Sequence, residues 1–304
     1  MKIPRVLILP SLCTLGNALC GFGAITLTTH ALVSAEAPYA IRFLDVKWAG
    51  YLVILAMVFD ALDGRLARFA RATSDFGGQL DSVADAVSFG AAPAFLMNRV
   101  VVESLRDVMP PGLEDILRIA WVCAAVYLGC ALIRLARFNV ENVHEEEAHM
   151  AFKGLPSPAA AGALVSLIIV LAEFMQEGSY PRLARVVLWL LPIVAAILGL
   201  LMVSGIRYSH ALNQMVRRRR PISHLVVILM GILLLVWLRE KVLPIVFVGY
   251  VLSGPVAGVV RRLTGRRPRP EPSDEPPPDA NDDPDERCGP AGLSERENGP
   301  TDEP

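Results

Sequence analysis

Residues 60–92 read DALDGRLARFARATSDFGGQLDSVADAVSFGAA, and the apolar stretch WAGYLVILAMVF (residues 48–59) comes immediately before them. Segments with the composition of membrane helices therefore carry four aspartates: Asp60, Asp63, Asp81 and Asp85. Charged residues at the centre of a membrane helix cost about 2.5–3.5 kcal/mol each on insertion scales, so four of them oppose insertion by roughly 10 kcal/mol. Aspartate is too short to reach the interface, as lysine or arginine can. The four are therefore candidate functional residues that face a polar cavity or bind cations.

The rest of the chain has the composition of an integral membrane protein. Of its 304 residues, 53% are hydrophobic and 19% are charged. The apolar residues fall in blocks of about 20, the length that spans the hydrocarbon core as a helix. We expect a polytopic, all-α membrane protein, with the first block retained as a span because it is too long for a signal peptide. The predicted spans are residues 8–33, 49–72, 77–99, 117–139, 157–176, 183–204, 222–238 and 242–260.

The distribution of Lys and Arg predicts the orientation of these spans. With the N-terminus in the cytoplasm, 18 of the basic residues among positions 1–270 fall on the inner side and 9 on the outer side. This bias satisfies the positive-inside rule. Both termini and the aspartate cluster then lie toward the cytoplasmic side of the cell membrane. The basic run at residues 217–220 favours contact with anionic lipid head groups, and we predict no nucleic-acid partner.

The C-terminal segment differs from the rest of the chain in charge. Residues 271–304 hold 12 acidic and 2 basic side chains, whereas the preceding 270 residues hold 18 acidic and 27 basic ones. The segment is rich in Pro and nearly free of aromatic residues, so it cannot bury enough apolar area to offset the entropy of ordering. We predict that residues 264–304 form a disordered acidic tail.

The spacing of the aspartates places them on two helix faces. Residues three or four apart share a face of a helix. One face carries Asp60, Gly64, Ala67 and Arg71, with Asp63 beside it, and the other carries Gly77, Asp81, Asp85 and Ser88. Two adjacent antiparallel helices joined by a short turn would bring the two acidic faces together.

Four converging carboxylates predict a site for metal-assisted chemistry on a phosphorylated substrate. Divalent cations are the natural neutralisers of carboxylates that repel one another in a low-dielectric pocket. Small residues near the aspartates leave room for a ligand, and the guanidinium of Arg68 suits a phosphate. A pair of metal ions can hold the attacking and leaving oxygens of an in-line displacement. One carboxylate should remain available as a general base.

The same residues resemble a known family. Asp60-x2-Asp63-Gly64-x2-Ala67-Arg68-x8-Gly77-x3-Asp81-x3-Asp85 matches every position of the CDP-alcohol phosphatidyltransferase signature. The resemblance implies six core helices, a homodimer, and transfer of a phosphatidyl group from a CDP-linked lipid to an alcohol with release of CMP. It implies that Asp60, Asp63 and Asp81 are ligands of Mg²⁺ or Mn²⁺, with two ions expected, and that Asp85 completes the metal site and acts as general base. Gly64, Ala67, Arg68 and Gly77 would line the pocket for the CDP-lipid, and Asn17 is expected to face it because an amide in a membrane helix needs partners.

Four further stretches resemble the multi-pass bacterial phosphatidylserine synthases within that family. They are LPSLCTLGNALCGFGAI (9–25), GGQLDSVADAVSFGAAPA (77–94), RLARFN (134–139) and FKGLPSPAAAG (152–162). The resemblance implies that the donor is CDP-diacylglycerol and the acceptor is L-serine. It also implies a catalytic membrane domain at residues 1–210 and two additional transmembrane helices at 211–263.

The acceptor contacts stay open at this point. A serine carboxylate needs a cation, which Arg134, Arg137 with Asn139, or Lys153 could supply. The same residues could instead be ordinary anchors on the inner side of the membrane. Ser88 fits either a contact to the acceptor or a contact between helices.

Two alternatives to this function remain. Glycerol 3-phosphate or inositol could replace serine as the acceptor, although a phosphorylated acceptor should need a more cationic pocket. Carboxylates in a membrane also mark ion pathways, so a cation transporter is the alternative from another class. A transporter should show acids at the midplane and inverted repeats, whereas these acids cluster toward one face and no internal repeat is visible in the sequence.

Overall fold

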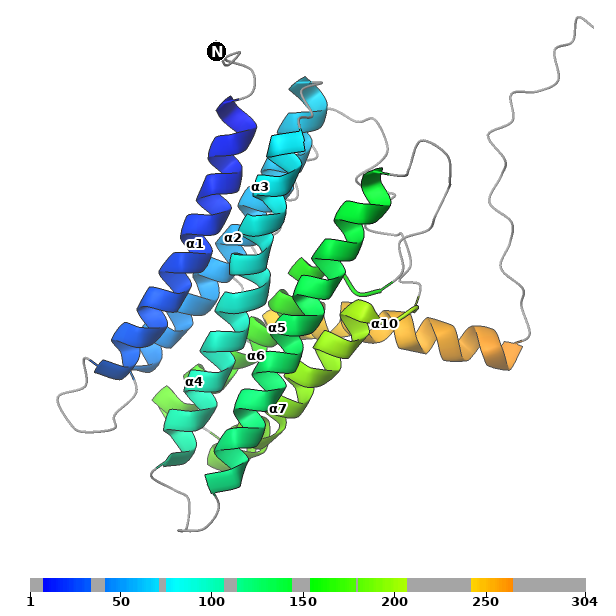
Figure 1. The fold of residues 1–304 in the computed structure, drawn as a ribbon. Coiled ribbons are helices and arrows are strands. Elements are labelled where there is room, and N and C mark those ends of the chain that lie inside the picture. Colours follow the sequence, from blue (N-terminus) through cyan, green and yellow to red (C-terminus); the bar gives the residue numbers. More distant parts are fainter. Residues whose placement is uncertain are drawn as a thin grey trace, which may run out of the picture. The chain divides into compact units, whose positions relative to one another are not determined.

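The computed structural model describes residues 8–33, 42–70, 75–106, 114–143, 154–178, 180–206 and 242–264. Every regular element within these ranges is a helix (Figure 1). The chain divides into two units, residues 1–263 and 264–304, and all described residues up to Leu263 belong to the first. The predicted acidic tail lies outside the described residues, apart from Thr264.

The described helices follow the predicted apolar blocks. The N-terminal pair is α1 (Ile8–Val33) and α2 (Phe43–Ala70). A continuous rod follows, made of α3 (Asp75–Asp85), the π-helical turn η2 (Ala86–Ala91) and α4 (Ala92–Arg106). The remaining described helices are α5 (Glu114–Val143), α6 (Ser157–Glu177), α7 (Pro181–Val203) and α10 (Val242–Thr264). The all-α prediction is confirmed, and the predicted span at 222–238 lies outside the described residues.

The third predicted span contains a π-helical turn. Residues 77–99 were predicted as one span, and in the structure the turn η2 lies within it, between α3 and α4. Pro93 lies in the first turn of α4. Proline has no backbone N–H, and its ring crowds the carbonyl four residues earlier, so a regular α-helix cannot continue unchanged through this point.

Several of these helices are long and apolar enough to cross a membrane. Within the described residues, five candidate spans are Ser11–Ala31, Phe76–Leu105, Leu117–Val140, Ser157–Glu177 and Pro181–Val203. The helix α2 has 28 residues and a length of about 42 Å, but its charged residues distinguish it from these five. The described part of the chain is therefore that of a multi-pass membrane protein.

Helix α6 is the central helix of the bundle. Nearly every residue from Ala160 to Ala172 is buried, and α6 packs against α2, α4 and α7. By contrast, α5 and α7 each expose one apolar face, with Trp121 and Ile133 on α5 and Trp189 and Leu200 on α7. A helix that is apolar all round and also buried forms the core, while the exposed apolar faces suit a lipid environment.

Hydrogen bonds at the helix ends fix the directions of neighbouring helices. The backbone N–H of Arg42, just before α2, donates to the carbonyl of Ala31 near the end of α1 at 3.1 Å. Near the start of α6, the N–H of Leu155 donates to the carbonyl of Leu201 near the end of α7 at 3.1 Å. The pairs α1–α2 and α6–α7 are therefore antiparallel. The first half of α1 consequently lies beside the second half of α2, which carries Asp60 and Asp63.

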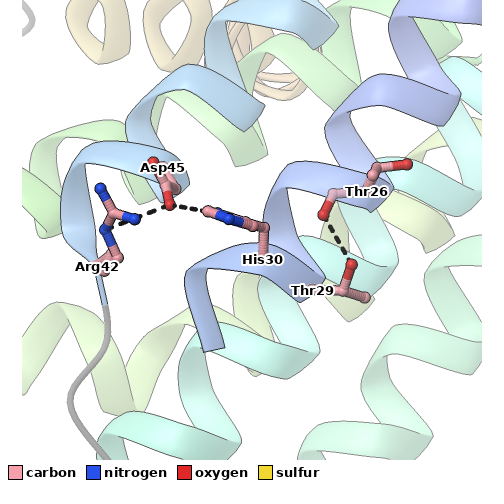
Figure 2. Close-up of polar contacts among 5 residues, drawn as sticks. All are labelled: Thr26, Thr29, His30, Arg42 and Asp45. Atoms are coloured by element: carbon pink, nitrogen blue, oxygen red, sulfur yellow. Dashed lines mark hydrogen bonds and ion pairs between the residues drawn. The ribbon is translucent and has the colours of Figure 1, made fainter. Parts of the chain in front are cut away.

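Figure 2 shows the opposite end of the α1–α2 pair. His30 on α1 lies 3.0 Å from the carboxylate of Asp45 on α2, and Arg42 lies 3.6 Å from the same carboxylate. Asp45 is thus an aspartate on the same helix as Asp60 and Asp63 with a separate set of partners. It lies about 22 Å along the helix from Asp60 at 1.5 Å per residue.

Candidate active site

Three of the four signature aspartates form one cluster. Asp60 and Asp63 on α2 and Asp81 on α3 each offer one carboxylate oxygen. These three oxygens lie within 4.8 Å of one another. Asp63 is buried, and the other two are half-buried. The two acidic faces expected from the spacing therefore meet, as predicted.

The oxygens of this cluster fit a hard divalent cation. Neither Asp63 Oδ2 nor Asp81 Oδ1, both buried, receives a hydrogen bond among the described residues. Thr14 on α1 and the backbone N–H of Gly64 are the hydrogen-bonding neighbours of Asp63. Buried carboxylate oxygens without donors are costly unless a cation compensates them, and carboxylate oxygens are the ligands that Mg²⁺ and Mn²⁺ take.

Asp85 lies beside the cluster and has a different partner. It is 9% exposed and close enough to Asp60, Asp63 and Asp81 to interact with them electrostatically. The side-chain amide of Asn17 on α1 donates a hydrogen bond to Asp85 Oδ1 at 3.0 Å. The prediction that Asn17 faces the site is consistent with this contact, since the amide is fully buried and directed at Asp85.

Ser88 joins the same contact between α1 and the rod. Its hydroxyl donates to the backbone carbonyl of Asn17 at 2.8 Å, and the residue is fully buried. A Cβ added at Gly21 on α1 would lie 2.5 Å from the Ser88 hydroxyl oxygen and 2.7 Å from its Cα. Glycine at 21 therefore permits the close approach of α1 to η2. Of the two interpretations of Ser88, the contact between helices is the one with a described partner.

Open space lies next to the aspartates on both helices. A Cβ added at Gly64 or at Gly78 would meet no atom of the described residues within 4 Å, the nearby backbone of its own helix aside. These glycines do not serve close helix packing, unlike Gly21. The expectation that small residues leave room beside the aspartates is consistent with this geometry.

The C-terminal half of α5 supplies further polar groups near Asp85. The guanidinium of Arg134 is half-buried, donates to the Ser157 hydroxyl at the start of α6 at 3.2 Å, and interacts electrostatically with Asp85. The Arg134 Nε is buried without a hydrogen-bond acceptor among the described residues. Asn139 Oδ1 accepts a hydrogen bond from the Ser82 hydroxyl on α3 at 2.8 Å.

The remaining predicted site residues are Arg137, Gly77, Ala67, Arg68 and Lys153. Arg137 is exposed on α5, and Gly77 is half-buried in the first part of α3. Ala67 and Arg68 lie in the last turn of α2, but their side chains are outside the part of the structure that is described. Lys153 also lies outside the described residues.

Sequence reasoning missed three neighbours of the site. They are Thr14 beside Asp63, Tyr250 on α10 beside the Arg134 guanidinium, and Tyr127 on α5 beneath η2. Thr14 lies three residues before Asn17, so it shares the face of α1 that carries that amide. No local pattern indicates Tyr250 or Tyr127, because each meets the site only through tertiary packing.

Comparison with known proteins identifies the family. The model of the CDP-alcohol phosphatidyltransferase family matches residues 7–200. The chain belongs to the CDP-alcohol phosphatidyltransferase family. The matched region contains the aspartate cluster, Asn17, Ser88 and Arg134, and it ends before α10.

Several relatives of this CDP-alcohol phosphatidyltransferase have the same protein name. The chain is 34% identical over 163 residues to the CDP-diacylglycerol–serine O-phosphatidyltransferase of Methanocaldococcus jannaschii, covering 54% of this chain and 64% of that protein. It is 34% identical over 172 residues to the protein of that name from Mycobacterium bovis, covering 55% and 54%. It is 32% identical over 216 residues to the one from Helicobacter pylori, covering 71% and 79%. The chain thus spans less than two thirds of the first two relatives and more of the third.

Proposed function

We propose that this protein transfers the phosphatidyl group of CDP-diacylglycerol to L-serine, forming phosphatidylserine and CMP. The observation that carries the proposal is the cluster of Asp60, Asp63 and Asp81 with Asp85 beside it, on helices of a membrane protein of this family. The names of the relatives support serine as the acceptor. This activity requires a lipid donor, a divalent cation and a water-soluble acceptor to meet at one place in the membrane.

Asp60, Asp63 and Asp81 are proposed to hold the metal, with Asp85 completing the site. Mg²⁺ or Mn²⁺, two ions in our proposal, would supply the positive charge that a diphosphate and its developing leaving group need. The unpartnered oxygens of Asp63 and Asp81 support this assignment. Thr14, next to Asp63, would keep that carboxylate in its orientation.

The donor is proposed to bind along the glycines of α2 and α3. The open space beside Gly64 allows a bulky ligand to approach the backbone. Gly77, Ala67 and Asn17 would line the same pocket for the CDP-lipid. Arg68 would pair with the diphosphate, because a guanidinium can donate two parallel hydrogen bonds to phosphate oxygens.

Asp85 is proposed to act as general base on the acceptor. Its carboxylate removes the proton of the serine hydroxyl while the serine oxygen bonds to the phosphorus that carries diacylglycerol. The bond from that phosphorus to the oxygen of CMP breaks, and CMP leaves with the electron pair. The amide of Asn17, 3.0 Å from Asp85 Oδ1, would hold the base in place.

Arg134 is the proposed partner of the acceptor carboxylate. Its guanidinium is half-buried beside Asp85 and keeps a donor, Nε, without an acceptor among the described groups. A bound serine carboxylate next to the base would satisfy that donor. Arg137 with Asn139, Lys153 and Ser88 remain proposed contacts of lower rank, since Asn139 and Ser88 already have the partners Ser82 and Asn17.

The location and assembly are also proposals. The bias of basic residues supports a cell-membrane protein whose active site and termini face the cytoplasm. We propose a homodimer surrounded by membrane lipid, as the family resemblance implies. The parts at 211–263 and 264–304 are proposed to be an added pair of spans and a solvated tail, outside the catalytic domain at 1–210.

An assay with a panel of alcohols tests the function. Purified protein receives CDP-diacylglycerol, Mg²⁺ or Mn²⁺, and serine, glycerol 3-phosphate or inositol, and CMP release is measured. We expect CMP with serine and its loss in Asp85→Asn. Activity with inositol or glycerol 3-phosphate alone would replace the acceptor. Cation flux by the wild type that is lost in the variant with all four Asp→Asn changes, with no CMP formed by the wild type, would replace the enzyme by a transporter.

A further inference from the structure

The rod that carries Asp81 and Asp85 changes its hydrogen-bond pattern directly after Asp85. The turn η2 spans Ala86–Ala91, and the backbone N–H of Ala92 donates to the carbonyl of Val87, five residues earlier. A π-helical turn is rare and is often found at functional sites. Here it connects the polar half of the rod, α3, to its apolar half, α4.

Pro93 leaves one carbonyl of this turn without its usual donor. In a regular α-helix the carbonyl of Phe89 would accept from the N–H of residue 93. Residue 93 is proline, which has no N–H and whose ring crowds that same carbonyl. Phe89 is fully buried, and a buried carbonyl without a donor is costly.

Tyr127 on α5 supplies a side-chain donor to this carbonyl. Its hydroxyl donates to the Phe89 carbonyl at 2.9 Å, and the residue is fully buried. The position of Tyr127 is itself constrained, because a Cβ added at Gly199 on α7 would lie 2.9 Å from the Tyr127 Cα. The backbones of α5 and α7 are therefore in close contact at this point.

Contacts hold η2 from the opposite side as well. Ser88 donates to the Asn17 carbonyl, and Gly21 allows α1 to approach Ser88. The turn is therefore fixed between α1 and α5, and its first neighbour in the chain is Asp85. A change in the pitch of η2 would rotate Asp85 relative to Asn17 and to the cluster on α2.

We propose that Tyr127 is a positioning residue for the reaction: it donates to the Phe89 carbonyl, for which Pro93 cannot supply the α-helical donor, and so fixes the π-helical turn that presents Asp85. This inference rests on the proposed function insofar as its kinetic test follows CMP release. Tyr127 itself does not touch the substrate. Its hydroxyl acts through the backbone, across one turn of helix.

The test compares Tyr127→Phe with a matched variant in the full-length protein. Tyr180→Phe removes a hydroxyl of the same kind from an exposed tyrosine at the start of α7. We expect kcat to fall about tenfold in Tyr127→Phe, because a base displaced by a fraction of an ångström loses its alignment with the nucleophile. The KM for CDP-diacylglycerol should change less than about twofold, because donor binding does not depend on this alignment. Tyr180→Phe should match the wild type.

A second variant distinguishes two roles of Tyr127: positioning Asp85, and merely donating a hydrogen bond to the buried Phe89 carbonyl. Pro93→Ala restores a backbone N–H that can donate to the Phe89 carbonyl. In the double variant Tyr127→Phe/Pro93→Ala we expect the melting temperature in detergent to recover and kcat to stay low, because the rod is then free to adopt regular α-helical pitch. Recovery of both quantities would overturn the proposal, as would an unchanged kcat in Tyr127→Phe.

Hydrogen exchange gives a readout that does not depend on the reaction. Amides of residues 86–92 should exchange faster in Tyr127→Phe than in the wild type or in Tyr180→Phe, while the amides of α1 exchange at the same rate. Equal exchange at 86–92 would overturn the proposal whatever the acceptor. A wild type that uses another alcohol instead of serine would correct the proposed function but leave both the kinetic and the exchange comparisons valid.

Discussion

At the scale of single residues, the amide of Asn17 joins α1 to Asp85, the proposed general base. It donates to Asp85 Oδ1 at 3.0 Å. We predict that Asn17→Ala lowers kcat about tenfold, since a hydrogen bond to a charged group contributes about 1.5–3 kcal/mol and its loss releases the base. The measurement is CMP release at saturating CDP-diacylglycerol and serine.

A buried threonine on the same helix is the control for Asn17. Thr28 donates to the carbonyl of Ala24 within α1 at 2.7 Å, at the end of the helix away from the aspartates. Thr28→Val removes a buried polar group without touching the site, so its kcat should equal that of the wild type. Equal losses of kcat in the two variants would show that removing any buried polar group from α1 lowers kcat, whether or not that group contacts Asp85.

Asp63 in the cluster should differ in metal binding from Asp45 at the other end of the same helix. We predict that Asp63→Asn weakens Mn²⁺ binding at least about tenfold, because a metal site loses one of its few anionic oxygens. Electron paramagnetic resonance of Mn²⁺ titrated into the purified protein measures this without turnover. Asp45→Asn, which removes the partner of His30 and Arg42 at the other end of α2 (Figure 2), should bind Mn²⁺ as the wild type does.

Much of the site can be predicted from single residues, and the remainder depends on long-range packing. The four aspartates and Asn17 are unusual for a membrane helix, so their types and spacing alone indicate that they converge. The partner of Asn17 is 68 residues away in the chain, and Tyr127 is an ordinary aromatic residue of an apolar helix. Nothing in the local sequence selects these pairs from the other polar groups.

At the scale of elements, the boundaries of the helices were predictable and the turn inside the rod was not. Continuous apolar blocks mark α1, α5, α6 and α7 within a few residues. Pro93 signals an irregularity in the third span, but not its kind. The sequence does not say whether a kink, a break or a π-helical turn follows, because this depends on whether α5 offers a donor.

The contact between α1 and η2 yields a prediction on stability. Gly21→Ala would place a Cβ 2.7 Å from the Ser88 Cα, and backbone cannot move as easily as a side chain. Overpacking of this kind costs about 1–3 kcal/mol, so the melting temperature in detergent should fall. Gly129→Ala on α5 meets no other atom within 4 Å and should be neutral or stabilising, because alanine favours a helix by about 1 kcal/mol over glycine. A stable Gly21→Ala protein would mean that α1 and η2 are less closely packed.

At the scale of the whole molecule, the class and the order of the helices follow from hydropathy, but their neighbours do not. Apolar blocks separated by polar segments predict spans, and basic residues predict an orientation. Neither identifies α6 as the central helix, although the many small residues in its first half (Ala159, Ala160, Ala161, Gly162 and Ala163) are of the kind that lets helices pack closely in a membrane. The pairing of α5 with α7 likewise depends on surfaces that come together only in the folded bundle.

An ion pair joins α2 to the central helix α6 at a distance from the aspartate cluster. Lys47 on α2 and Glu173 on α6 form a salt bridge, with side chains 13% and 20% exposed. Lys47 lies 13 residues before Asp60 in the sequence, which is about 20 Å along the helix. Because both side chains are half-buried, removing one member should cost less than the roughly 3–5 kcal/mol of a fully buried pair, whereas replacing both members can be neutral.

The predicted outcome for this pair therefore separates the stability of the bundle from its activity. Lys47→Met should lower the melting temperature in detergent, and Lys47→Met/Glu173→Leu should recover most of it. At a temperature where all three proteins are folded, kcat and the KM for CDP-diacylglycerol should be equal, because the pair holds α2 against α6 without contacting the aspartates. A loss of kcat in the recovered double variant would mean that the charge pair also sets the position of Asp60 and Asp63, and that α2 transmits changes along its whole length to the site.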